Sequence, residues 1–278
     1  QVTIMFFSAV ALAVVGIAKM GGPAAFMETL QTKFPDHLHA FLPATDEAFP
    51  WPGVILGLGF VLSPAYWCAN QAILLRTLGA RSEWDGRASM IFAALAKTFV
   101  PVLIILPGFF ALIFAVEKLP RQDMALPWVI KNVMPPGLSG LFFVAFISAL
   151  QASVSSALNS TAVMITRDII GVVRPVIRND RETLRMGRLA TFVVLFIGVA
   201  SSKLVSETES IYRFVQTALS MFQGPMFALV SAGILTKKVT AKAGIWTLAL
   251  GLAFAGVLKA FDWNMLYIAF GTFLFSIA

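Results

Sequence analysis

The feature that most constrains this chain is a set of long apolar runs, such as the stretch from Thr98 to Val116. Crossing about 30 Å of hydrocarbon takes about 20 helical residues at about 1.5 Å each. A transmembrane β-barrel would instead show segments of about ten residues in which polar and apolar side chains alternate. These runs do not alternate, so they predict an all-α membrane protein built as a helical bundle.

The composition of the chain agrees with this class. Of its 278 residues, 58% are apolar and 13% are charged, whereas soluble domains carry about 25% charged residues. This composition excludes an ordinary soluble enzyme and a disordered segment. The single cysteine, Cys68, lies inside an apolar run and excludes a disulfide framework within the chain.

Eight apolar segments can be marked, and we expect each to cross the membrane within one transmembrane domain that covers residues 1–278. The first and last segments look truncated, because the chain begins with Gln1 and ends at Ala278 inside an apolar run. We therefore expect a piece of a longer protein. The segments are residues 2–18, 53–75, 88–116, 138–165, 188–203, 210–235, 243–259 and 263–278.

The basic residues sort unequally between the two sides of these spans. The richer side is cytoplasmic by the positive-inside rule, so residues 19–52 form a long external loop. The net charge of +7 is then a topology signal, and we predict no nucleic-acid partner. The cytoplasmic set is Arg76, Arg81, Arg87, Arg167, Arg174, Arg178, Arg181, Arg185, Arg188, Lys237, Lys238 and Lys242, and the external set is Lys19, Lys33, Lys118, Arg121, Lys131, Lys203 and Lys259.

Two long polar side chains lie within predicted spans, where polar groups are costly and are candidates for function. Lys97 lies about 14 Å into its span at about 1.5 Å per residue, and its ammonium suits hydroxyls, carbonyls or a carboxylate. The alternative is a lysine that extends to the headgroups. Gln216 offers amide donors and an acceptor to a hydroxylated ligand, or else bonds to a neighbouring helix.

The span at 53–75 contains a proline in its middle. Pro64 removes a backbone donor and clashes with the preceding turn, so we expect the helix to be kinked or broken near Ser63. Broken helices at the midplane form the solute and ion sites of many secondary transporters, and a simple proline kink is the alternative. Tyr66 and Trp67 follow, and their rings either stack on a ring-shaped solute or pack within the bundle.

The span at 138–165 carries a face of small and hydroxyl residues, because they recur every three or four positions. Such a face permits close helix packing. It also supplies oxygen ligands for an alkali cation, and the spacing leaves both interpretations open. The residues are Ala149, Ala152, Ser153, Ser156 and Ser160.

Several motifs occur in order along nearly the whole chain. They are Pro50-Trp51-Pro52-Gly53, Tyr66-Trp67-Cys68-Ala69-Asn70-Gln71 with Arg76, Lys97, Ser155-Ser156-Ala157-Leu158-Asn159-Ser160-Thr161 with Asp168, and the stretch from Gly233 to Lys238. Together they resemble the sodium/solute symporter family, and within it most closely the sodium/glucose cotransporters.

This resemblance implies the fold of the leucine transporter, in which two five-helix repeats are inverted and the first helix of each is broken. On it, the chain begins late in the last helix of the first repeat. It then contains the whole second repeat, with the broken helix at 53–75, and adds later helices.

The resemblance also implies a solute site. Lys97, Gln216 and an aromatic gate at Tyr66 match sugar-contacting positions of the family. Ser63 stands where relatives carry Asn or Thr, and Asn70 stands where they carry Asp or Asn.

The sodium site implied by the resemblance uses a backbone carbonyl that matches Ala149 and two adjacent hydroxyl residues. In this chain those two positions are Ala152 and Ser153, so one hydroxyl ligand is missing. We therefore expect Na⁺ as the coupling ion with a weak dependence on it, and H⁺ is the alternative.

These expectations describe a cation-coupled symporter that imports a small solute, most simply a sugar, by alternating access. Alternatives are a monocarboxylate, an amino acid or a vitamin on the same scaffold, or a membrane sensor domain of a signalling protein. We expect no enzyme, because no paired carboxylates or activated nucleophile occur at membrane depth. The predicted location is the lipid bilayer of the cell membrane, with a bacterial inner membrane preferred.

Overall fold

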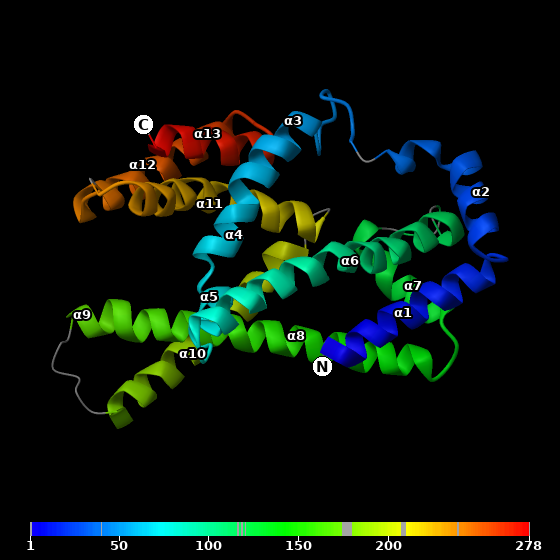
Figure 1. The fold of residues 1–278 in the computed structure, drawn as a ribbon, viewed down its shortest axis with the longest axis horizontal. Helices are drawn as coiled ribbons and strands as arrows, with labels where there is room; N and C mark the ends of the chain where they lie inside the picture. Colours follow the sequence, from blue (N-terminus) through cyan, green and yellow to red (C-terminus); the bar gives the residue numbers. More distant parts are fainter. Residues whose placement is uncertain are drawn as a thin grey trace. The chain divides into compact units, whose positions relative to one another are not determined.

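A computed structural model describes residues 2–39, 41–115, 117, 119, 121–173, 180–206, 210–237 and 239–277. Throughout these residues the chain is helical apart from turns and one isolated bridge between Leu42 and Pro50 (Figure 1). The predicted all-α helical class is confirmed. Gln1 and Ala278, and four of the basic residues used to orient the spans, namely Lys118, Arg174, Arg178 and Lys238, lie outside the described residues.

The chain forms two compact units, which we describe separately. Unit 1 comprises Gln1–Leu38 and Arg81–Ser210, and unit 2 comprises His39–Ala80 and Ile211–Ala278. The helices of unit 1 are α1 (Val2–Lys19), α2 (Pro23–Lys33), η1 (Pro35–Leu38), α6 (Glu83–Ala115), η4 (Gln122–Met124), α7 (Ala125–Val133), α8 (Leu138–Val163), η5 (Met164–Ile170), α9 (Gly171–Val173) and α10 (Asp180–Ser206). Those of unit 2 are α3 (Trp51–Gly53), η2 (Val54–Leu62), α4 (Ser63–Ala69), α5 (Gln71–Leu78), α11 (Ile211–Leu235), α12 (Ala241–Ala260) and α13 (Met265–Ile277).

Among the described residues, six helical stretches are long and apolar enough to cross a membrane. A seventh is present if α1 and α2, which are bent by 75° at the break between them, form one span. Helix α13 is apolar but shorter, and each of the eight segments marked in the sequence overlaps a helix. The six stretches are Trp51–Ala69, Glu83–Ala115, Leu138–Ile170, Arg181–Lys203, Ile211–Leu235 and Ala241–Ala260.

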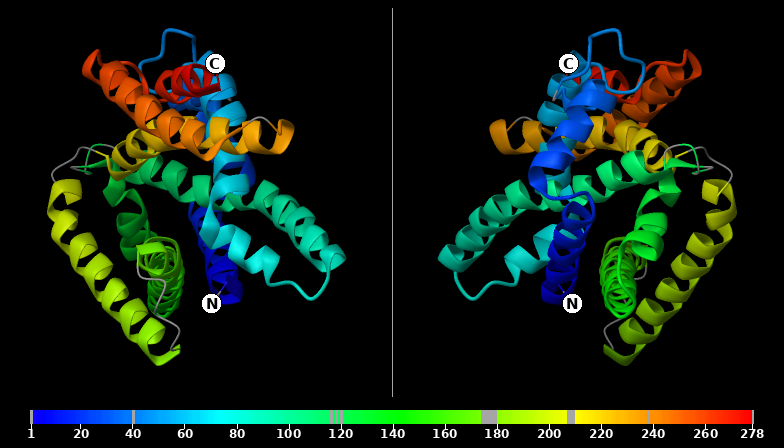
Figure 2. Two further views of the ribbon diagram at one scale, coloured as in Figure 1. Left: turned by 90° about the vertical axis from the view of Figure 1, so that its left-hand side faces the viewer. Right: turned by 90° about the vertical axis from the view of Figure 1, so that its right-hand side faces the viewer.

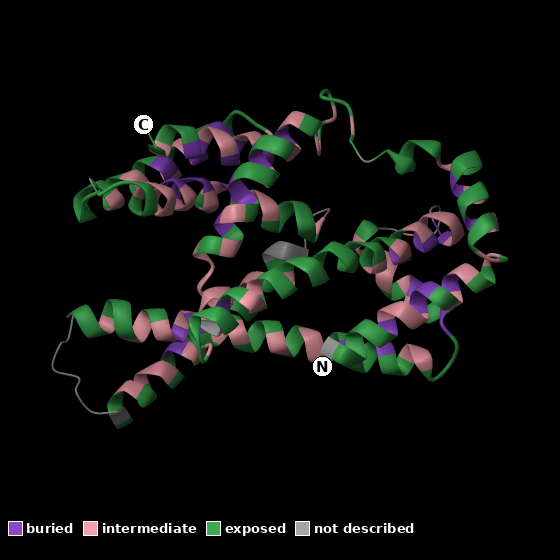
Figure 3. Cartoon of the chain, viewed as in Figure 1, coloured by how far each residue is buried: buried purple, intermediate pink, exposed green. Residues whose placement is uncertain are grey.

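Helices α8 and α10 of unit 1 leave most of their apolar surface open (Figure 3). Only 11% of the apolar stretch of α8 and 6% of that of α10 is buried, and Phe143, Phe192 and Phe196 are exposed. Soluble proteins rarely expose contiguous apolar patches larger than a few hundred Å². In hydrocarbon, exposed apolar surface does not have to be solvated by water, so the two helices fit a bilayer.

The core of unit 2 forms where α13 packs against α11, α12 and η2, and both views of Figure 2 show α13 alongside α12. Val61, Leu266 and Phe273 are among its buried side chains. The helices approach closely because glycines face α13. A Cβ on Gly57 would overlap the backbone of Leu266, and one on Gly224 would overlap the side chain of Thr272.

The helix through residues 51–69 corrects one expectation. The chain is not broken at Ser63, which keeps helical dihedrals (φ −66°, ψ −50°), and the expected kink there stays a prediction. The preceding segment η2 is a π-helix, and the Ser63 amide donates to the carbonyl of Leu58, five residues back. This wider register leaves room for Pro64, since the proline clash arises in the tighter i→i−4 pattern. The helical dihedrals end instead at Asn70 (φ −79°, ψ 109°).

Candidate functional site

The two aromatic residues predicted to contact a solute lie next to each other on α4. The ring centroids of Tyr66 and Trp67 are 6.0 Å apart, and their planes meet edge to face at 89°. Tyr66 is 40% exposed, and Ser63, one turn earlier, is also exposed. Helix α4 packs against α11, the helix that carries Gln216. The aromatic pair and Gln216 therefore lie in the same unit, on two helices that contact each other.

Asn70 has a structural task in addition to its predicted role. Its side-chain Oδ1 accepts a hydrogen bond from the backbone N–H of Ala72 (3.0 Å), and its carbonyl accepts from Ile73 and Leu74. These bonds satisfy the first free donors of α5, as an N-cap residue does. A solute contact at Asn70 stays a prediction, and it would have to share the side chain with this cap.

Gln216 on α11 is half-buried, and its Nε2 donates a hydrogen bond to the hydroxyl of Tyr212 (3.0 Å), one turn earlier. The ring of Tyr212 lies 6.2 Å, centroid to centroid, from that of Phe49. The bond uses one of the two amide donors and directs the amide oxygen away from Tyr212. A second donor and an acceptor remain for a ligand, which suits a hydroxylated molecule.

Lys97 lies on α6, in unit 1, and is exposed. Its helix is 33 residues long, about 50 Å at about 1.5 Å per residue, and exceeds the thickness of the hydrocarbon core. Because Lys97 and Gln216 belong to different units, their joint contact with one solute stays a prediction.

The predicted ion ligands lie on α8 in unit 1. The hydroxyl of Ser153 donates a hydrogen bond to the carbonyl oxygen of Ala149 (3.0 Å), so the two oxygens lie side by side. Serine and threonine often bond back to the preceding turn of a helix, and Thr161 does so with Ala157 on the same helix. The arrangement therefore offers a cation two adjacent oxygens, and Ala152 adds only a methyl group.

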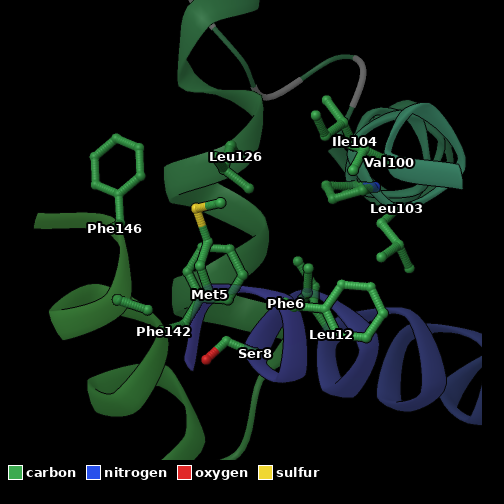
Figure 4. Close-up of a pocket in the computed structure, with 13 residues that line it drawn as sticks. Met5, Phe6, Ser8, Leu12, Val100, Leu103, Ile104, Leu126, Phe142 and Phe146 are labelled. Carbon is green, nitrogen blue, oxygen red and sulfur yellow. The ribbon is translucent and has the colours of Figure 1, made fainter. Parts of the chain in front are cut away.

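Unit 1 also contains an apolar pocket of about 230 Å³ between α1, α6, α7 and α8 (Figure 4). Its lining includes Phe6, Ile104, Leu126 and Phe142, and the only polar side chain among the lining residues is Ser8. Ser8 is 2% exposed, and its Oγ has no hydrogen-bond partner among the residues that the structure describes. A sugar requires several hydrogen bonds, so this pocket does not suit one.

Sequence reasoning singled out the solute candidates of unit 2 but missed Phe49 and Asn264. Phe49 contacts Tyr212, and Asn264 binds the loop that carries Phe49. The proline-rich motif that begins at Pro50 was a signal that the preceding loop is held in place. Asn264 carried a weaker signal, as a helix-capping residue type near the start of the last apolar run.

Long apolar helices with polar side chains along them define the class, a multi-pass α-helical membrane protein. The chain belongs to the sodium:solute symporter family, whose model matches residues 1–251. This confirms the family that the sequence motifs indicated.

Three relatives illustrate the similarity. A sodium/glucose cotransporter of Vibrio parahaemolyticus is 28% identical over 268 residues, which cover 90% of this chain and 48% of the relative. Sodium/glucose cotransporter 1 of Mus musculus is 26% identical over 288 residues, covering 90% and 43%. Sodium/myo-inositol cotransporter 2 of Oryctolagus cuniculus is 25% identical over 288 residues, covering 91% and 42%. The chain thus spans about half the length, or less, of these relatives.

Proposed function

We propose that the protein is a sodium-coupled symporter of the cell membrane that imports a small hydroxylated solute, most simply a sugar. The observation that carries this proposal is the family match over residues 1–251. Relatives named for glucose and for myo-inositol support a polyhydroxylated solute. Gln216, with a donor and an acceptor left after its bond to Tyr212, supports it independently.

In the proposed mechanism, Na⁺ and solute favour the same conformation, so each increases the affinity of the other by the same factor. Alternating access then carries both inward. The oxygens of Ala149 and Ser153 would contribute to the ion site. Gln216 and Lys97 would bond to solute hydroxyls, and one of the two perpendicular rings of Tyr66 and Trp67 would stack on the sugar ring.

The test is uptake of labelled D-glucose, D-galactose and myo-inositol by cells that express the complete natural protein containing this chain. Removing a neutral hydrogen bond costs about 1 kcal/mol and removing a charged one about 1.5–3 kcal/mol. We therefore expect Vmax/KM to fall about fivefold in Gln216→Ala and at least about tenfold in Lys97→Ala.

Two matched controls change the same residue types at exposed positions of unit 1. Gln31→Ala on α2 and Lys131→Ala on α7 should leave uptake unchanged. Unchanged sugar uptake in both Gln216→Ala and Lys97→Ala would reject the proposed solute site. Transport of labelled pyruvate that is lost in Lys97→Ala, without any sugar transport, would replace the sugar with a monocarboxylate.

A further inference from the structure

The loop before α3 is attached to the start of α13 by one side chain. The amide nitrogen Nδ2 of Asn264 donates to the carbonyl oxygens of Glu47 (2.7 Å) and Ala48 (3.1 Å). At the same time its Oδ1 accepts from the backbone N–H of Leu266 (2.8 Å). Asn264 therefore caps α13 with its oxygen and holds the loop with its nitrogen.

The same loop is stabilised from within by Asp46. One oxygen of this half-buried carboxylate accepts from the backbone N–H groups of Ala48 (2.9 Å) and Phe49 (2.6 Å). Charge-assisted bonds of this kind are about twice as strong as neutral ones. Between them, Asp46 and Asn264 determine the path of the backbone that leads into Phe49.

Phe49 connects this loop with the solute candidates of unit 2. Its side chain packs against the unit 2 core that contains Val61 and Leu266, and its ring lies 6.2 Å from that of Tyr212. Tyr212 in turn accepts the hydrogen bond from Gln216. The series of contacts from Asn264 to Gln216 lies wholly within unit 2.

We propose that Asn264 and Asp46 are positioning residues for solute binding, which hold Phe49 against Tyr212 and thereby orient the amide of Gln216. The inference rests on the proposed function, because it takes Gln216 as a solute contact. It adds that solute affinity depends on the loop at residues 46–49, which precedes Gln216 by more than 150 residues in the sequence.

Asn264→Asp separates the two tasks of this residue. The carboxylate still accepts from the Leu266 amide and caps the helix, but it cannot donate to the loop carbonyls and repels them. We expect the KM for labelled D-glucose to rise about fivefold, the effect of losing a contact of about one hydrogen bond. Vmax per molecule at the cell surface should stay within twofold. The matched control is Asn132→Asp, because Asn132 also donates from Nδ2 to a backbone carbonyl, that of Trp128 (2.8 Å), but in unit 1.

A double-mutant cycle tests whether Asn264 acts on solute binding through Tyr212. Asn264→Asp combined with Tyr212→Phe, which removes the acceptor of the Gln216 bond, should raise KM no more than the larger single change. If Gln216→Ala raises KM but Asn264→Asp does not, the positioning role is overturned and the proposed solute site stands. If Gln216→Ala leaves KM unchanged, Gln216 is not a solute contact, and the positioning role fails with it. Equal losses of surface protein and Vmax with KM unchanged would mean a purely structural role.

Discussion

The two units differ in how far their long apolar helices are buried. In unit 2, 28% of the Trp51–Ala69 stretch is buried, whereas in unit 1 only 6% of the apolar stretch of α10 is. Glycines at 57 and 224 bring backbones of unit 2 into contact. The buried cluster of unit 1 is built around Phe110 instead, where α1, α2, α6 and α7 meet.

This difference matches the proposed function in part, because the solute candidate Lys97 stands on α6 in unit 1, with the ion candidates. The solute candidates Tyr66 and Gln216 stand on helices that are packed into a core. The ion candidates Ala149 and Ser153 stand on α8, only 11% of whose apolar stretch is buried. A rigid scaffold suits a site that must match a polyhydroxylated molecule. A cation needs only a few oxygens at suitable distances.

The largest effect expected from this comparison is at Gly224. Gly224→Ala places a methyl group against Thr272 and 2.7 Å from the carbonyl oxygen of Ala269, both on α13. Overpacking of this kind costs about 1–3 kcal/mol, so we expect a clear fall in the thermal unfolding midpoint in detergent.

Gly233→Ala is the control for this change, on the same helix and with open space around the added Cβ. It should stabilise the helix by up to about 1 kcal/mol, because alanine has the higher helix propensity. Equal midpoints for the two variants would contradict the close packing of α11 on α13.

A smaller effect is expected at the ion candidates. Ala152→Ser restores the missing hydroxyl and should lower the Na⁺ concentration for half-maximal uptake about fivefold, as one added contact of about 1 kcal/mol would do. The control is Ala157→Ser, the same change at an exposed position of α8. No shift at position 152 would mean that the ion site is built from other groups or that protons drive transport.

The smallest effect compares two buried serines. Within the described part of the chain, the Oγ of Ser8 in unit 1 has no hydrogen-bond partner, whereas Ser220 in unit 2 donates to the carbonyl of Thr217 (2.7 Å). Ser220→Ala should lower the free energy of unfolding by about 1 kcal/mol, while Ser8→Ala should be neutral or slightly stabilising. Denaturation of each variant in detergent measures both, and a larger loss at Ser8 would show that its hydroxyl is bonded.

Local patterns predicted what depends on neighbours along the chain. Apolar runs located the helices, and spacing placed Ala149 and Ser153 on one helix face. Their pairing as ion ligands came from the family resemblance, and the structure adds the hydrogen bond between them. The change to π-helical pairing before Pro64 escaped prediction, because hydrogen-bond register leaves no mark in residue spacing. The contact of Phe49 with Tyr212 escaped it too, since it joins segments that only the tertiary fold brings together.

The solute candidates show the same contrast between what neighbours along the chain determine and what the tertiary fold determines. Gln216 was singled out because an amide within an apolar run is unusual, and the structure adds its hydrogen bond to Tyr212. Its partnership with Lys97 joins two units and stays a prediction that the uptake variants test.

The most direct measurement is uptake of labelled D-glucose by the complete natural protein in liposomes, with Na⁺ outside and K⁺ inside. A sodium-coupled symporter accumulates the sugar transiently above its equilibrium level, and an ionophore that collapses the Na⁺ gradient abolishes this overshoot. Glucose that only equilibrates, at the same rate with K⁺ on both sides, would contradict sodium-coupled sugar transport.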